Sequence, residues 1–114
     1  MLKIATTPGT DNVDTFQAFT PDGEPYSFSA VTRVDIDICS ERAALSGGVL
    51  TISSADVPPA VAFNGTFLSV RFGALSPYRG DYYPTVTAYD ADNPNGVVLA
   101  GKGYPTEILL QVAC

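Results

Sequence analysis

Residues 66–92 of the chain read TFLSVRFGALSPYRGDYYPTVTAYDAD and carry its strongest structural signal. Apolar and polar residues alternate over 66–73 and again over 82–91. A period of two is typical of strands that bury one face. A corner that contains glycine and ends in Gly80-Asp81-Tyr82 joins the two segments. The stretch therefore predicts two strands of an all-β fold.

The same alternation recurs on both sides of this stretch. In residues 31–39, Val34 and Ile36 point one way while Asp35 and Asp37 point the other. No window has the spacing of a capped amphipathic helix, so minimal helix is expected. The pattern predicts a single β-sandwich of about seven or eight antiparallel strands. The remaining strands are expected over residues 2–6, 13–20, 49–53, 61–63, 97–100 and 106–112.

Turn motifs separate these segments. In Pro21-Asp22-Gly23, proline presets φ, aspartate can hydrogen-bond its own backbone and glycine accepts a positive φ. Asn64-Gly65 is typical of a tight hairpin. Pro84 has no N–H for a strand ladder, so an edge or a bulge is expected there. Because no repeat or linker divides the chain, residues 1–114 are expected to form one domain.

The composition argues against several functional classes. With 46% hydrophobic and 16% charged residues in 114, the chain can bury a core and is not expected to be disordered. Twelve acidic and six basic residues give a net charge of −6, which opposes binding to nucleic acid. The apolar run around residues 108–110 is far shorter than the ~20 residues that span a bilayer, so no membrane partner is expected. The N-terminus has no standard secretion signal.

Two cysteines, Cys39 and Cys114, are too few for the disulfide framework of a secreted mini-domain. Cys39 follows a predicted strand and is expected to be a small buried hydrophobe. The preferred interpretation is two reduced thiols in a reducing compartment, with a Cys39–Cys114 disulfide left open as the alternative.

Catalytic residues are not evident. The chain has no histidine, so a cysteine nucleophile would lack a histidine base, and two cysteines cannot make an ordinary zinc site. Asp35 and Asp37 share one face of a strand, where paired carboxylates can do acid–base work or bind metal. Because they stand beside Arg33, we interpret them as a solvent-facing charged ladder. The protein is expected not to be an enzyme and to have no catalytic residue and no cofactor.

The oxygen-rich loop from Asp90 to Gly96 has some features of a calcium-binding loop. Asp92 occupies the third position counted from Asp90, but a proline falls at the fifth, the glycine comes one place late and no glutamate stands at the twelfth. We therefore interpret the loop as a turn and predict no metal site.

Aromatic residues offer the best remaining indication of function. If the alternating apolar residues of 66–73 and 82–91 face inward, then Phe67, Arg71, Tyr83 and Tyr89 lie on the opposite face. Tyrosine and arginine are favoured at protein interfaces, so these four residues are the predicted partner contacts. Coverage of these side chains by loops or by a second layer of the same chain is the alternative.

Gly80-Asp81-Tyr82 resembles the tyrosine corner of immunoglobulin-like sandwiches, in which a tyrosine near the start of a late strand bonds back to the backbone. Pro84 stands where an antibody domain would have its cysteine, and the chain has no tryptophan. The expectation is therefore an immunoglobulin-like sandwich that is not of the antibody type.

Two longer stretches carry a resemblance to a family. They are PDGEPYSFSAVTRVDIDI (residues 21–38) and NGTFLSVRFGALSPYRGDYYPTVTAYDADNPNGVVL (residues 64–99). Their order looks like that of small virion proteins of tailed bacteriophages. In particular it is similar to the immunoglobulin-like N-terminal module of phage baseplate upper proteins and to small tail or neck proteins. The similarity covers roughly residues 14–100.

The resemblance implies a non-enzymatic structural role in a virion assembled in the cytoplasm of a bacterial host. It implies an assembly or adaptor protein of the neck, tail or fibre-attachment region. The implied partners are other virion proteins, in a symmetric homo-oligomer or multicopy assembly. Two alternatives stay open: a capsid decoration protein, and a module that binds carbohydrate or a host surface.

Overall fold

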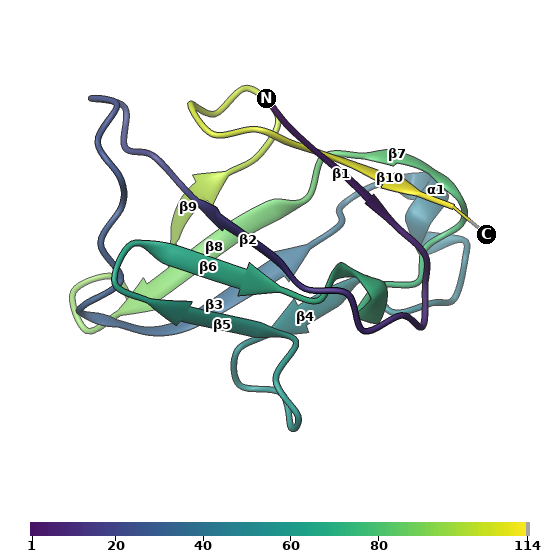
Figure 1. Ribbon diagram of the computed structural model, residues 1–114, viewed down its shortest axis with the longest axis horizontal. Coiled ribbons are helices and arrows are strands. Elements are labelled where there is room, and N and C mark those ends of the chain that lie inside the picture. The colour runs from purple at the N-terminus through teal and green to yellow at the C-terminus, as the bar shows by residue number, and fades with distance from the viewer. Residues whose placement is uncertain (114) are drawn as a thin grey trace.

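Ten short strands, one turn of α-helix and one 3-10 turn form the fold in the computed structural model, which describes residues 1–113 (Figure 1). Every strand except β7 lies over a segment that was predicted to be a strand, and β7 shares only Tyr82 with such a segment. The strands are β1 (Leu2–Thr6), β2 (Asp14–Gln17), β3 (Val31–Asp37), β4 (Thr51–Ser53), β5 (Val61–Asn64), β6 (Phe67–Val70), β7 (Gly80–Tyr82), β8 (Thr85–Asp90), β9 (Val97–Ala100) and β10 (Ile108–Val112); the turns are α1 (Glu41–Ala44) and η1 (Phe72–Ala74).

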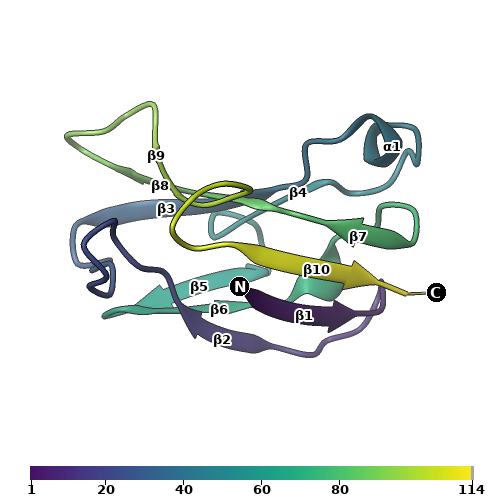
Figure 2. The same ribbon diagram turned by 90° about the horizontal axis from the view of Figure 1, so that it is seen from above.

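The strands lie in two layers (Figure 2). One layer has the order β2-β6-β5. The other consists of β4-β3-β8-β9 together with β1-β10-β7. Strand β9 pairs with β8, and β10 pairs with β7. Strands β9 and β10 therefore follow one another along this layer, beside β8 and β7. The strands of this layer therefore occupy five side-by-side positions, with β1 at one edge and β4 at the other. In order, the positions are β4, β3, β8 with β7, β9 with β10, and β1.

The three-stranded layer packs on the larger one, and the fold is a β-sandwich, as predicted. The all-β prediction is confirmed. The described residues hold ten strands where about seven or eight were expected, and one of them, β7, lies over residues 80–82, where the end of a corner was expected. One pairing also differs from the expected antiparallel arrangement, since β1 runs parallel to β10.

Pro84 lies at the break between β7 and β8, as its missing donor led us to expect. The residues Tyr83 and Pro84 belong to neither strand. A shift of register between Val86 and Thr87 in the pairing with β9 adds a second irregularity. The interruptions let one long stretch of chain pair with β10 at one end and with β9 at the other.

The core lies between the layers and is built from the inward residues of the alternating strands. Ile36 on β3, Val86 on β8 and Leu68 on β6 are each fully buried. Phe72 is fully buried as well, and its ring stacks on that of Phe16 at 6.2 Å between centroids. Burying a side chain of this size contributes about 1.5–3 kcal/mol, so the inward rows supply the main stabilising term.

The turn before β7 is a tyrosine corner, as predicted. The Tyr82 hydroxyl donates a hydrogen bond of 2.7 Å to the carbonyl oxygen of Tyr78, and Tyr82 is buried. Arg42 of α1 donates to the carbonyl oxygen of Arg79 at 3.0 Å. These two bonds hold the loop between η1 and β7 from both sides.

The cysteine prediction is wrong for Cys39, whose side chain is exposed. Strand β3 ends at Asp37, so the inward alternation stops after Ile38. Cys39 then lies just before Ser40, whose hydroxyl caps α1 by accepting from Ala43 N at 3.0 Å. Cys114 lies outside the described residues, and the open alternative of a Cys39–Cys114 disulfide stays a prediction.

Candidate functional site

The four predicted contact residues lie on two different faces of the sandwich. Phe67 lies on β6, in the three-stranded layer, and is half exposed. Arg71 directly follows β6 and makes an ion pair of 3.3 Å with Asp11. Tyr89 lies on β8 and Tyr83 just before it, in the other layer. The structure therefore divides them between the two layers, two in each, and a partner contact by any of them stays a prediction.

The two tyrosines are partly buried, and each ring has a cation beside it. The guanidinium carbon of Arg33 lies 4.0 Å from the centroid of the Tyr89 ring, and Lys102 Nζ lies 5.5 Å from that of Tyr83. Cation–π pairs of this kind contribute about 0.5–1 kcal/mol at exposed sites. The Tyr89 face is therefore already occupied by a side chain of the same molecule.

The paired carboxylates Asp35 and Asp37 lie on the outer face of β3, as predicted. Asp37 accepts a hydrogen bond of 2.6 Å from the Thr51 hydroxyl on β4. Asp35 Oδ1 lies 3.3 Å from Arg33 Nε, in an ion pair without hydrogen-bond geometry. Each carboxylate thus has a polar neighbour on the sheet, but Asp35 Oδ1 is buried and accepts no hydrogen bond, so a solvent-facing ladder stays a prediction.

The loop after β8 is organised by one oxygen atom. Asp90 Oδ1 accepts hydrogen bonds from Asp92 N at 2.9 Å, from Asn93 N at 2.8 Å and from Asn93 Nδ2 at 3.0 Å. An Asx turn of this kind uses the carboxylate to hold its own backbone. Within residues 1–113, no group of three or more histidine, cysteine, aspartate or glutamate side chains is placed to hold a metal ion.

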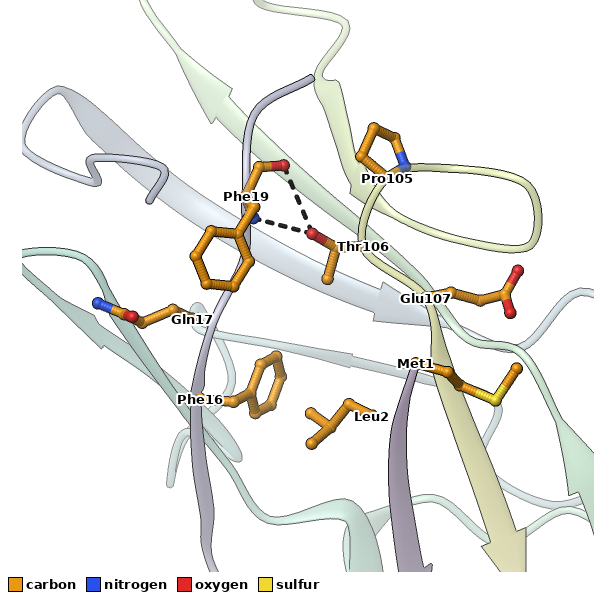
Figure 3. Close-up of a pocket in the computed structure, with 8 residues that line it drawn as sticks. All are labelled: Met1, Leu2, Phe16, Gln17, Phe19, Pro105, Thr106 and Glu107. Carbon is orange, nitrogen blue, oxygen red and sulfur yellow. Dashed lines mark hydrogen bonds between the residues drawn. The ribbon is translucent and has the colours of Figure 1, made fainter. Parts of the chain in front are cut away.

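A groove of about 360 Å³ opens at the seam between the two layers, where β1 and β2 lie beside each other (Figures 2 and 3). The Phe16 ring and the Leu2 side chain point toward each other across it. Phe19 and Met1 stand at its rim, 41% and 69% exposed. We call it the seam groove; it is lined by Met1, Leu2, Phe16, Gln17, Phe19, Pro105, Thr106 and Glu107.

Thr106 fixes the backbone at one end of the seam groove. It is buried, and its hydroxyl accepts from Phe19 N at 2.8 Å and lies 3.4 Å from the Phe19 carbonyl oxygen, to which it donates (Figure 3). One side chain therefore satisfies both backbone groups that Phe19 turns toward the seam. The Phe19 ring stays exposed although its backbone is fixed.

A second, more apolar pocket of about 340 Å³ adjoins the seam groove and shares Phe19 and Pro105 with it. Tyr26 forms part of its wall, and burial, followed by the charge of Asp90, raises the pKa of Tyr26 above 10.0. The exposed Tyr104 ring completes an apolar surface that continues from the seam groove. We call this the Tyr26 pocket; it is lined by Phe19, Thr20, Pro21, Tyr26, Val97, Val98, Leu99, Tyr104 and Pro105.

Neither Phe19 nor Thr106 was predicted from the sequence as a site residue, because both lie outside the strongly alternating residues 66–92. A signal for Phe19 was present. Ala18 and Phe19 are consecutive apolar residues in an alternating segment, so only one of them can point inward. Ala18 is buried and Phe19 is exposed. Thr106 gave no signal, because its partner is 87 residues away.

Comparison with known proteins adds no relative. No family model, curated protein or solved structure matches the chain. Among the described residues, no helix is long and apolar enough to cross a membrane. The geometry of the seam groove and the motifs of the sequence are therefore the basis for a functional proposal.

Proposed function

We propose that the protein is a non-enzymatic structural component of a tailed-phage virion, an assembly or adaptor protein in the neck, tail or fibre-attachment region. The motifs in residues 21–38 and 64–99 support this role, since they resemble those of small phage virion proteins. The two-layered β-sandwich is consistent with the fold that this resemblance implies.

The observation that carries the proposal is the apolar surface around Phe19. Met1, Phe19 and Tyr104 are each between 41% and 69% exposed, and the seam groove and the Tyr26 pocket adjoin one another beneath them. Clustered exposed apolar groups of this kind are typical of surfaces that bind a protein. On a chain with a net charge of −6, such a surface favours docking to another protein.

The proposal is tested by purifying particles from a lysed host that carries the gene and measuring the chain by quantitative mass spectrometry. We expect the chain at a fixed copy number per particle. About a dozen copies would indicate a ring in the neck or tail, and on the order of hundreds would indicate capsid decoration instead. A chain that is absent from the particles, and monomeric when mixed with their proteins, would refute the assembly role.

The carbohydrate-binding alternative has less support from the geometry. A sugar commonly stacks on an open aromatic face, yet Arg33 lies over Tyr89 and Lys102 lies near Tyr83. A glycan array separates the two functions. Saturable glycan binding that is lost in Tyr89→Ala would favour the carbohydrate module over the assembly role.

A further inference from the structure

Within the described residues, no strand is hydrogen-bonded to the edge of β2 that borders the seam groove. Strand β2 is the outer strand of its layer and pairs only with β6. Strand β1 lies on the other side of the groove but belongs to the other layer and pairs only with β10. The backbone groups on this edge of β2 are therefore free of a ladder partner within the described residues.

The direction of these groups follows from the hydrogen bonds at the end of β2. Phe19 turns its N–H and C=O toward Thr106 at the seam, while the Ala18 carbonyl accepts from Tyr26 N at 2.8 Å on the opposite side. Backbone groups alternate between the two edges of an extended strand. Gln17 and Thr15 therefore direct their N–H and C=O groups toward the seam, as Phe19 does.

The pairing of β6 with β5 and with β2 independently gives the same direction for the backbone groups of β2. Arg71 N donates to the Ala60 carbonyl at 2.8 Å, so residues 60 and 71 form a hydrogen-bonded pair in the β5–β6 ladder. By alternation Ser69 also faces β5, and Val70 and Leu68 face β2. Leu68 is opposite Phe16, so Phe16 bonds β6 while its neighbours in β2 face the seam.

We propose that the seam groove receives an extended segment of another protein, which adds to the free edge of β2 as a new strand. The inference rests on the proposed assembly role and names the kind of partner. Thr15 and Gln17 offer two donors and two acceptors, and main-chain bonds of this kind give affinity in strand addition. The N–H and C=O of Phe19 are already bonded to the Thr106 hydroxyl and do not pair with the added strand. The added strand is therefore a short segment.

The side chains that line the seam groove specify the chemistry of this segment. Residues of the added strand that are opposite Phe16 point into the groove, where they meet Phe16 and Leu2 and are therefore apolar. Glu107 at the groove and Asp14 at the start of β2 are acidic, in a chain of net charge −6. The alternate residues of the segment are therefore basic.

Two copies of this chain do not fit together through their seam grooves, because two concave surfaces do not fill each other. Lys3 also stands on β1, and a lysine on an edge strand opposes pairing of that strand. On β2, by contrast, Thr15 and Gln17 follow Asp14, and both have neutral side chains.

Fluorescence anisotropy with a labelled synthetic peptide of alternating valine and lysine tests the proposal. We expect saturable binding that weakens about tenfold or more when the peptide is N-methylated at alternate residues on either edge, because pairing needs its N–H groups. A peptide of alternating valine and glutamate is expected to bind at least about tenfold more weakly, since both molecules are then acidic. Equal binding of the methylated and unmethylated peptides would overturn strand addition.

Two substitutions at one position separate backbone from side chain. Gln17→Pro removes the N–H that faces the seam, and proline is tolerated on an edge strand. Gln17→Ala keeps that N–H; both variants lose the 2.8 Å side-chain bond to Thr66. We expect Gln17→Pro to bind the valine–lysine peptide about tenfold more weakly than Gln17→Ala does. Equal affinities in two folded variants would refute the proposal.

Amide hydrogen exchange on the unmodified protein gives a readout that does not depend on a variant. We expect the valine–lysine peptide to slow exchange at Thr15 and Gln17. No slowing there would overturn the proposal. Slowing that grows with protein concentration without peptide would also overturn it, because it would identify a second copy as the occupant.

Peptide binding by a chain that is absent from particles would support strand addition and refute the virion role. If the chain is present in particles at a fixed copy number but the peptide does not slow exchange at Thr15 and Gln17, the virion role is supported and strand addition is refuted.

Discussion

The Tyr82 hydroxyl donates a hydrogen bond of 2.7 Å to the carbonyl oxygen of Tyr78, four residues earlier in the chain. Tyr82 is only 5% exposed, whereas the Tyr78 side chain is 51% exposed. The bond therefore connects a buried ring at the end of β7 to the surface loop that precedes this strand. It holds that loop against β7, the strand that pairs with β10.

The Tyr82→Phe variant tests how much this hydrogen bond contributes to the stability of the fold. It removes the hydroxyl and keeps the buried ring, so we expect the free energy of unfolding to fall by about 1 kcal/mol. Urea titration measures the change. Tyr78→Phe is the matched control, because it removes an exposed hydroxyl and leaves the Tyr78 carbonyl in place. A loss in the control as large as in Tyr82→Phe would contradict a special role for the corner.

The Thr106→Val variant tests how the end of β2 is held. Valine keeps the shape of threonine but leaves the N–H and C=O of Phe19 without their partner, so a loss of about 1–2 kcal/mol is expected. Hydrogen exchange at the Phe19 amide should become faster. In Thr51→Val, which removes an exposed hydroxyl bond to Asp37, the Phe19 amide should exchange as in the unmodified protein. An unchanged Phe19 amide in Thr106→Val would show that Thr106 does not hold it.

The Asp90→Ala variant separates a turn from a cation site. Three hydrogen bonds converge on Asp90 Oδ1, so their loss is expected to destabilise the fold by about 1–2 kcal/mol. Asp92→Ala is the control, because Asp92 contributes its backbone N–H to the turn. Calcium should leave the melting temperature of the unmodified protein unchanged. A rise with calcium that disappears in Asp90→Ala would establish a cation site instead.

Alkaline pH should weaken the fold through Tyr26. Burial, and then the negative charge of Asp90, raise the pKa of Tyr26 above the value of 10.0 for an unperturbed tyrosine. The folded state thus favours the neutral phenol, and this contribution to stability is complete below about pH 10 and is lost as the pH rises through the folded pKa. Urea titrations at increasing alkaline pH measure the loss.

Two variants check this assignment to Tyr26. Tyr26→Phe should lose stability less steeply above about pH 10 than the unmodified protein does. Asp90→Asn removes the second cause of the raised pKa, so the total loss of stability at alkaline pH should be smaller in this variant. An identical pH slope in Tyr26→Phe and the unmodified protein would show that other groups cause the alkaline loss.

Much of the local structure was predictable from neighbouring residues. The alternation of Val34 and Ile36 with Asp35 and Asp37 depends only on the period of an extended chain, and β3 has the expected inward and outward faces. Pro84 marked the break in the long strand for a local reason, its missing N–H. Cys39 was misjudged because the general preference of cysteine for burial was placed above the alternation, which puts residue 39 on the same outward side as Asp35 and Asp37.

The placement of the predicted contact residues depended on which strands became neighbours. Phe67 and Tyr89 each point away from the core, as alternation requires, but β6 and β8 belong to opposite layers. A period of two specifies a face of a strand and does not specify the sheet to which that strand belongs. Alternation therefore predicted the outward direction of Phe67 and Tyr89 and could not predict that they lie in different layers.

The sequence by itself determined the all-β class, the strand segments and the tyrosine corner, because alternation, turn residues and proline act within a few positions of the chain. Only the tertiary structure decided that β1 pairs in parallel with β10, that β2 is left with a free edge, and that Thr106 meets Phe19. These features join residues up to about a hundred positions apart, and they arise when the two layers pack to bury their apolar faces.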